Sequence, residues 1–159
     1  MKADYDRLLK YLTKHQITSD GALRILGRSM SSTSIIFGSD FHVGSIYAIC
    51  SPHPTREDGL EIKPAKQQVA LYSILESVVD RLSKKAKLFV VNGEPIDGAN
   101  RRSNARGSWT SDLGDQITDF GKIIKIIPYE RLLLTRGSAY HVDLDGTNFE
   151  ELTANQLGA

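Results

Sequence analysis

The residues of this 159-residue chain best suited to chemistry are an aspartate and a histidine one residue apart, Asp40 and His42. They follow an apolar run and Gly38, which predicts a short buried strand over residues 34–37 that ends in a tight turn. Ligand sites in α/β sheets form beyond the carboxyl ends of the strands. A carboxylate and an imidazole there would suit zinc, manganese or iron. The alternative is a turn-capping aspartate with an unrelated histidine nearby.

Two further stretches place polar side chains directly after an apolar run. Glu94 and Asp97 follow the run 88–91, and Asn92 lies at its end. Ser138 and His141 follow the run 132–134. Three strand ends that each supply metal-ligating groups are hard to attribute to chance. They favour a shared polar site over three unrelated turns.

The apolar periodicity predicts the elements that would position these residues. We expect strands over residues 34–37, 88–91 and 131–135, and helices over 64–85, 112–127 and 147–157. Residues 45–63 contain two prolines and show no clear period, so we expect a long loop there. Strands and helices that alternate in this order predict an α/β fold with a largely parallel sheet.

Charge and composition exclude several classes of protein. Basic and acidic residues nearly cancel, 20 against 19, so no overall field favours nucleic acid or a membrane. The single cysteine, Cys50, excludes an internal disulfide, and we expect it to be a small buried or half-buried apolar side chain; the alternative is a reactive thiol. No apolar run reaches the roughly 18 residues that a membrane span needs. The first residues lack a signal-peptide pattern. We therefore expect a cytoplasmic protein with no membrane partner.

The three polar blocks together resemble the signature of the calcineurin-like metallophosphoesterases: Asp-x-His, then Gly-Asp-x-x-Asp, then Gly-Asn-His, each after a strand. The matching segments here are residues 40–42, 93–97 and 137–141. The chain is most similar to a branch found in phages and prophages. In that branch the second block is Asn-Gly-Asp-x-x-Asp-Gly, and the third is roughly Arg-Gly-Thr-x-Tyr-His. The similarity runs from about Ser34 to the end.

This resemblance implies a metallophosphoesterase sandwich over residues 34–159 that hydrolyses a phosphate mono- or diester at a dinuclear metal site. The divalent ions would be manganese, zinc, iron or magnesium, and nucleic acid is one candidate for the phosphate-ester substrate. By position in the motifs, the implied metal ligands are Asp40, His42, Glu94 and Ser138. The implied catalytic residues are His141, as general acid or phosphate contact, and Asp97, which would orient a metal ligand.

We expect phosphate contacts from Asn92, Arg101 and Arg102. The two arginines lie in the polar stretch 99–111 that follows the second block, and guanidinium groups bind phosphate through paired hydrogen bonds. The alternative for the arginines is a solvated loop. For His141 the alternative is a side chain packed against Tyr140.

The chain departs from the family pattern at three points. Glu94 stands where the family has an aspartate, and its extra methylene matters because ligand distances must agree within about 0.2 Å. Ser138 stands where the family has an asparagine ligand. The resemblance also leads us to expect that the C-terminal part with further histidines is missing. We therefore expect impaired phosphoesterase activity, and the alternative is a catalytically inactive relative.

Residues 1–33 are predicted to form a separate helical segment. This segment contains two short helical patterns, then Gly27, then a serine-rich stretch. The arrangement resembles the start of a helix-turn-helix module. The strand predicted from residue 34 would cut its third helix short, so we expect a shortened remnant. The alternative is a DNA-associated phage regulatory protein.

Overall fold

The structure, a computed structural model, describes residues 34–82, 84–99, 106–137 and 148–159. The chain divides between residues 33 and 34 into two units, and only the second is described. The predicted N-terminal helices therefore lie outside the described residues. Four predicted site residues lie outside them as well: Arg101, Arg102, Ser138 and His141.

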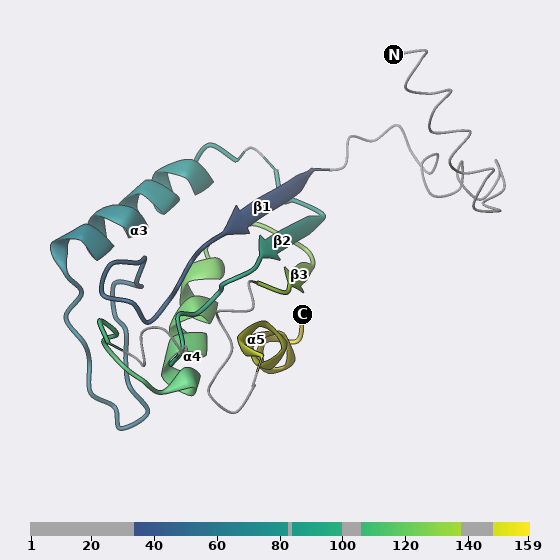
Figure 1. Cartoon of the computed structure of the whole chain (residues 1–159). Coiled ribbons are helices and arrows are strands. Elements are labelled where there is room, and N and C mark those ends of the chain that lie inside the picture. Colours follow the sequence, from purple (N-terminus) through teal and green to yellow (C-terminus); the bar gives the residue numbers. More distant parts are fainter. Residues whose placement is uncertain (1–33, 83, 100–105, 138–147) are drawn as a thin grey trace, which may run out of the picture. The chain divides into compact units, whose positions relative to one another are not determined.

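Three parallel strands form the sheet of the described domain, in the order β1-β2-β3 (Figure 1). The strands are β1 (Ile35–Ser39), β2 (Leu88–Asn92) and β3 (Leu132–Thr135). The helices that alternate with them are α3 (Lys66–Val79), α4 (Leu113–Ile124) and α5 (Phe149–Leu157). The predicted α/β class and parallel sheet are confirmed.

Local capping explains where two of the helices begin. The Asp112 carboxylate accepts a hydrogen bond from the Asp115 N–H (2.9 Å), which caps α4. The Asn148 side chain accepts from the Glu151 N–H (2.8 Å), which caps α5. Gly158, with φ 69°, ends α5 in the left-handed conformation that glycine adopts readily.

Helix α3 is shorter than predicted, because it ends at Val79 and not near residue 85. The next backbone N–H groups, those of Arg81 and Leu82, donate to the carbonyls of Val78 and Val79, three residues back. These tighter bonds close the last turn and release the chain from the helix. Lys84 and Lys85 therefore lie beyond the helix.

The core lies between one face of the sheet and the helices. Phe89 and Val91 of β2 and Phe120 and Ile123 of α4 are fully buried. The apolar periodicity that predicted a helix over 112–127 therefore corresponds to the buried face of α4. Tyr72 of α3 joins the same cluster, and so does Phe149 of α5.

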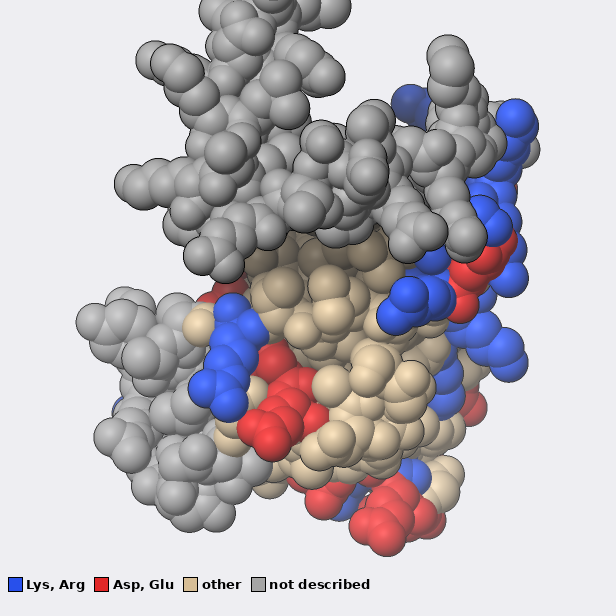
Figure 2. Space-filling view, turned by 90° about the vertical axis from the view of Figure 1, so that its right-hand side faces the viewer, with Lys and Arg blue, Asp and Glu red and all other residues tan. Residues whose placement is uncertain are grey.

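The prediction that the first strand is buried was wrong. Strand β1 lies at the edge of the sheet and continues to Ser39. Ile36 packs against the core, whereas Ile35 and Phe37 point to the other face and are 47% and 72% exposed. Among the described residues, helices α3, α4 and α5 cover only the first of these faces. One side of the domain has a broad uncharged surface between acidic and basic side chains (Figure 2).

The loop 45–63 has neither helix nor strand, as predicted, but α4 fixes it at several points. Asp119, buried in α4, accepts hydrogen bonds from both the backbone N–H (3.1 Å) and the hydroxyl of Ser51. Asp115 accepts from the Glu57 N–H (2.7 Å), and the Lys122 ammonium donates to the His53 carbonyl (2.9 Å). These bonds satisfy loop backbone groups that no strand pairing would satisfy.

Two smaller predictions concern single residues and membrane contact. Cys50 is buried, as predicted, and burial raises the pKa of its thiol. Among the described residues, no helix is long and apolar enough to cross a membrane.

Candidate metal centre

The loops that follow β1 and β2 lie side by side because backbone hydrogen bonds join them beyond the strand ends. The His42 N–H donates to the Glu94 carbonyl (3.0 Å), and the Val43 N–H donates to the Pro95 carbonyl (3.1 Å). The Asp97 N–H returns a bond to the Val43 carbonyl (2.8 Å). The parallel pairing of the sheet is thereby extended into the loops, and their polar side chains are brought together.

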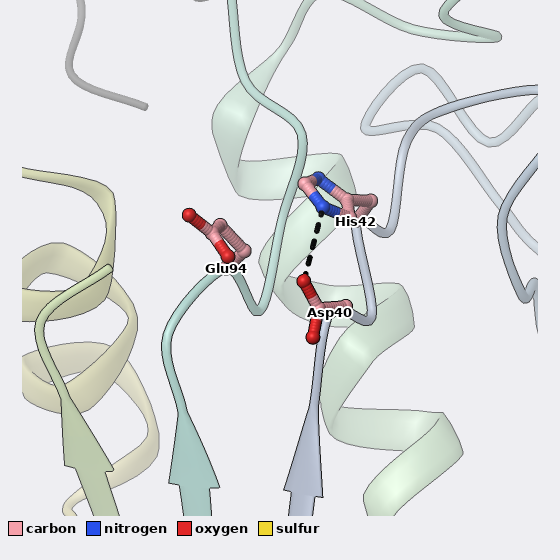
Figure 3. Close-up of side chains that lie close together, drawn as sticks. All are labelled: Asp40, His42 and Glu94. Carbon is pink, nitrogen blue, oxygen red and sulfur yellow. Dashed lines mark ion pairs between the residues drawn. The ribbon is translucent and has the colours of Figure 1, made fainter. Parts of the chain in front are cut away.

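Three of the predicted metal ligands converge at this point (Figure 3). Asp40 and His42 come from the loop after β1, and Glu94 comes from the loop after β2. One ligand atom from each lies within 4.8 Å of the others. The Nε2 atom of His42 is 4.0 Å from Oδ1 of Asp40. The Asp40 side chain is 66% exposed, so a ligand can reach the group from solvent.

The same three residues have an unusual backbone. Asp40, His42 and Glu94 have φ values of 56°, 45° and 47°, and no other described non-glycine residue has a positive φ. Such a conformation costs roughly 1–3 kcal/mol per residue and persists only where the surrounding structure imposes it. Residues of this kind cluster at functional sites. The strained backbone therefore coincides with the group of potential ligands.

Asp97 lies behind His42 and contacts its other ring nitrogen. The Nδ1 atom of His42 is 3.5 Å from Oδ1 of Asp97, long for a hydrogen bond but close for an ion pair. The Ser108 hydroxyl donates to Oδ2 of the same carboxylate (3.3 Å). Asp97 is thus positioned to orient the His42 ring so that Nε2 faces Asp40. The sequence pointed to the stretch 99–111 through its arginines but not to Ser108, which belongs to none of the three motifs.

The surrounding carboxylates raise the pKa of His42 above its ordinary value of 6.5. The close contact with the Asp97 carboxylate is the largest cause, and the negative charges of Asp97, Glu94 and Asp40 add to it. Partial burial of the ring opposes them, because desolvation disfavours the charged form. The site therefore favours a positive charge on or near the imidazole.

A fourth carboxylate, which none of the three sequence motifs contains, adjoins this group. Glu150 in the first turn of α5 is 4% exposed, and its Oε1 atom accepts a hydrogen bond from the Glu94 N–H (3.3 Å). Glu150 and Glu151 are consecutive glutamates, and the sequence does not indicate which of the two side chains is buried. Only the packing of α5 against the strand ends distinguishes them.

Asn92, the predicted phosphate contact, lies at the end of β2 and is exposed. Its side-chain oxygen accepts a hydrogen bond from the hydroxyl of Thr135 (2.9 Å), the residue opposite in the register of β3. The structure therefore links Asn92 to β3 and does not include it in the group formed by Asp40, His42 and Glu94.

The donor atoms of the group are two carboxylate oxygens and an imidazole nitrogen. This set fits manganese, zinc or iron, which accept both oxygen and nitrogen ligands. Comparisons of the chain with models of protein families, with curated proteins and with solved structures find no match. The described residues form an α/β domain with a parallel sheet and a potential metal site, and the comparisons assign the chain to no family.

Proposed function

We propose that the described domain binds a divalent metal ion through Asp40, His42 and Glu94 and acts as a metal-dependent phosphoesterase. The main support is a coincidence. The three described non-glycine residues with left-handed backbone are the same three whose ligand atoms lie within 4.8 Å of one another. A fold that maintains three costly conformations at one point favours a function for that point over an accidental acidic cluster.

The residues divide into those that would bind the ion and those that support them. Asp40 and Glu94 offer oxygen, and His42 offers Nε2. Asp97 faces Nδ1 of the same ring, the arrangement that fixes the tautomer and orientation of a metal-binding histidine. Ser108 in turn contacts Asp97. A bound divalent ion would neutralise phosphate charge and lower the pKa of a coordinated water.

The choice of a phosphate ester as substrate rests on the resemblance of the three sequence blocks to the calcineurin-like metallophosphoesterases. A calcineurin-like sandwich is part of the same proposal. The exposed Asp40 carboxylate is consistent with a substrate at this site, because a substrate needs access to the ion from one side. Ser138 and His141, the third block's proposed ligand and acid, lie outside the described residues.

Metal binding is the first test. Isothermal titration with Mn²⁺ and Zn²⁺ should show a site on the unaltered chain that is lost in Asp40→Asn and His42→Gln. Asp58→Asn is the matched control, because Asp58 is also an exposed aspartate, with its side chain 54% exposed and paired with Arg56. Equal binding by all four proteins would remove the basis for the site.

Turnover separates the active enzyme from the inactive alternative. We expect slow, metal-dependent hydrolysis of bis(p-nitrophenyl) phosphate that disappears in Asp40→Asn. Slow turnover is expected because Glu94 replaces the shorter aspartate of the family. Tight metal binding without any turnover would favour a metal-binding protein that lacks phosphoesterase activity.

A further inference from the structure

We infer that Glu150 is a positioning residue for the proposed metal site: its buried carboxylate keeps the backbone of Glu94 in the conformation that places a Glu94 carboxylate oxygen near the ligand atoms of Asp40 and His42. This inference rests on the proposed function. Glu150 itself lies in α5, 56 residues from Glu94 in the sequence. It would act through Glu94 and not as a ligand.

The contrast between two neighbouring glutamates supports this role. Glu150 and Glu151 both occupy the first turn of α5, where a negative charge stabilises the helix dipole. Glu151 serves that purpose in solvent, with its side chain 64% exposed and its carboxylate 3.6 Å from Arg136. Glu150 is 4% exposed, and burial of a carboxylate is costly unless the group is hydrogen-bonded. Helix stability alone does not require the inward orientation.

The hydrogen bond from the Glu94 N–H gives the buried carboxylate its partner at the site. The bond joins Oε1 of Glu150 to the backbone of the residue that has φ 47°. Hydrogen bonds to a charged acceptor are stronger than those between neutral groups. An acceptor at this position fixes the orientation of the peptide group between Gly93 and Glu94. That orientation determines the direction in which the Glu94 side chain leaves the backbone.

Two glycines make the contact sterically feasible. A Cβ atom on Gly137 would lie 2.5 Å from Oε1 of Glu150 and 3.1 Å from Oε1 of Glu94. A Cβ atom on Gly93 would lie 2.9 Å from Cα of Gly137. The chain segments after β2 and β3 therefore approach each other, backbone to backbone, and both carboxylates border Gly137. A larger residue at position 137 would force the Glu150 carboxylate to shift from its present position.

The test compares Glu150→Ala, Glu150→Gln and the matched control Glu151→Ala in the full chain. The first readout is hydrogen exchange of the Glu94 amide in metal-free protein, followed by NMR. We expect exchange about tenfold faster in Glu150→Ala, because a hydrogen bond to a charged group is lost. Glu150→Gln should retain slow exchange, since its amide oxygen can accept the same N–H. Glu151→Ala should resemble the unaltered chain.

The second readout is Mn²⁺ affinity, measured by calorimetry. We expect Glu150→Ala to weaken binding by about 10–100-fold, the range for residues that support metal ligands. Glu150→Gln should recover most of the affinity, and Glu151→Ala should leave it unchanged. Recovery by glutamine also shows that the alanine effect is not a general loss of folding.

The outcomes separate the two proposals. If the unaltered chain binds no Mn²⁺ or Zn²⁺, the metal site is wrong, and the exchange of the Glu94 amide still decides whether Glu150 fixes this turn. If metal binds but Glu150→Ala changes neither affinity nor exchange, the positioning role is wrong and the metal site stands. An equal effect of Glu151→Ala would also overturn the role, because helix charge would then explain the result.

Discussion

His42 lies between two carboxylates that face different nitrogens of its ring. Asp40 is near Nε2, at 4.0 Å, and Asp97 is near Nδ1, at 3.5 Å. The two contacts have different consequences. The first leaves a ligand atom directed at the exposed side of the site, and the second sets the orientation and the pKa of the ring.

We predict that Asp97→Asn lowers the pKa of His42. The close contact with the Asp97 carboxylate is the largest cause of the upward shift, and the negative charge of Asp97 also contributes. An amide removes the charge and leaves partial burial, which acts in the opposite direction. NMR titration of the His42 ring in metal-free protein would measure the change, with Asp58→Asn as control. An unchanged pKa would show that Asp97 does not govern the ring.

The raised pKa of His42 also predicts opposite pH dependences for stability and metal binding. The folded protein favours the protonated ring, so its stabilising effect is complete below the unfolded pKa near 6.5 and is lost as pH rises through the folded pKa. Metal requires the neutral ring, so affinity should rise over the same range. Unfolding and calorimetry at several pH values, compared with His42→Gln, would test both. A stabilising effect that grows with pH would contradict the prediction.

At the scale of elements, Gln116 of α4 ties together segments that surround the site. Its side chain is fully buried, accepts a hydrogen bond from the Gly98 N–H (2.8 Å) and donates to the Thr110 carbonyl (2.9 Å). The loop after β1 passes directly over this side chain at Gly44, where a Cβ atom would lie 2.3 Å from the amide carbon. Helix α4 therefore determines the path of the loop that begins with Asp40 and His42.

We predict that Gly44→Ala destabilises the domain more than Gly59→Ala. Both glycines have positive φ, 111° and 80°, so both substitutions introduce backbone strain of about 1–2 kcal/mol. Gly59 has open space around it, whereas Gly44 abuts Gln116, which adds about 1–3 kcal/mol for overpacking. Urea unfolding of the two variants measures the difference. Equal losses would mean that the loop can move away from α4 without cost.

At the scale of the whole described domain, the helices leave one face of the sheet uncovered. Ile35, Phe37 and Leu133 are 47%, 72% and 46% exposed, although strand alternation would permit polar residues there. Phe37 and Leu133 flank Val90 on this face, and Val90 is 7% exposed. Large exposed apolar patches are uncommon on soluble domains. The three side chains belong to the two edge strands, which flank β2.

We predict that this face binds the apolar dye ANS in the native state and that Phe37→Thr reduces the fluorescence. Threonine keeps a β-branched side chain suited to the strand while removing the aromatic surface. Tyr47→Thr is the matched control, because Tyr47 is 75% exposed but lies in the loop after β1. A larger reduction in Tyr47→Thr would place the dye site elsewhere.

The sequence by itself determined most of the elements and the place of the site residues along the chain. The spacing of Ile117, Phe120 and Ile123 predicts the buried face of α4, because helical periodicity is a local property. Asp40, His42 and Glu94 follow apolar runs that form parallel strands, and such strands end at the same edge of a sheet. Their convergence could therefore be predicted without coordinates.

Only the tertiary structure decided which of two residues of the same type is buried and which side chains it contacts. Glu150 is buried against Glu94 whereas Glu151 is exposed, and Phe37 faces outward although its apolar run predicted burial. Ser108, which belongs to none of the motifs, donates a hydrogen bond to Asp97. The left-handed backbone of His42 and Glu94 persists because neighbouring segments bond to it. Each result depends on contacts between segments distant in sequence, and local periodicity contains no information about them.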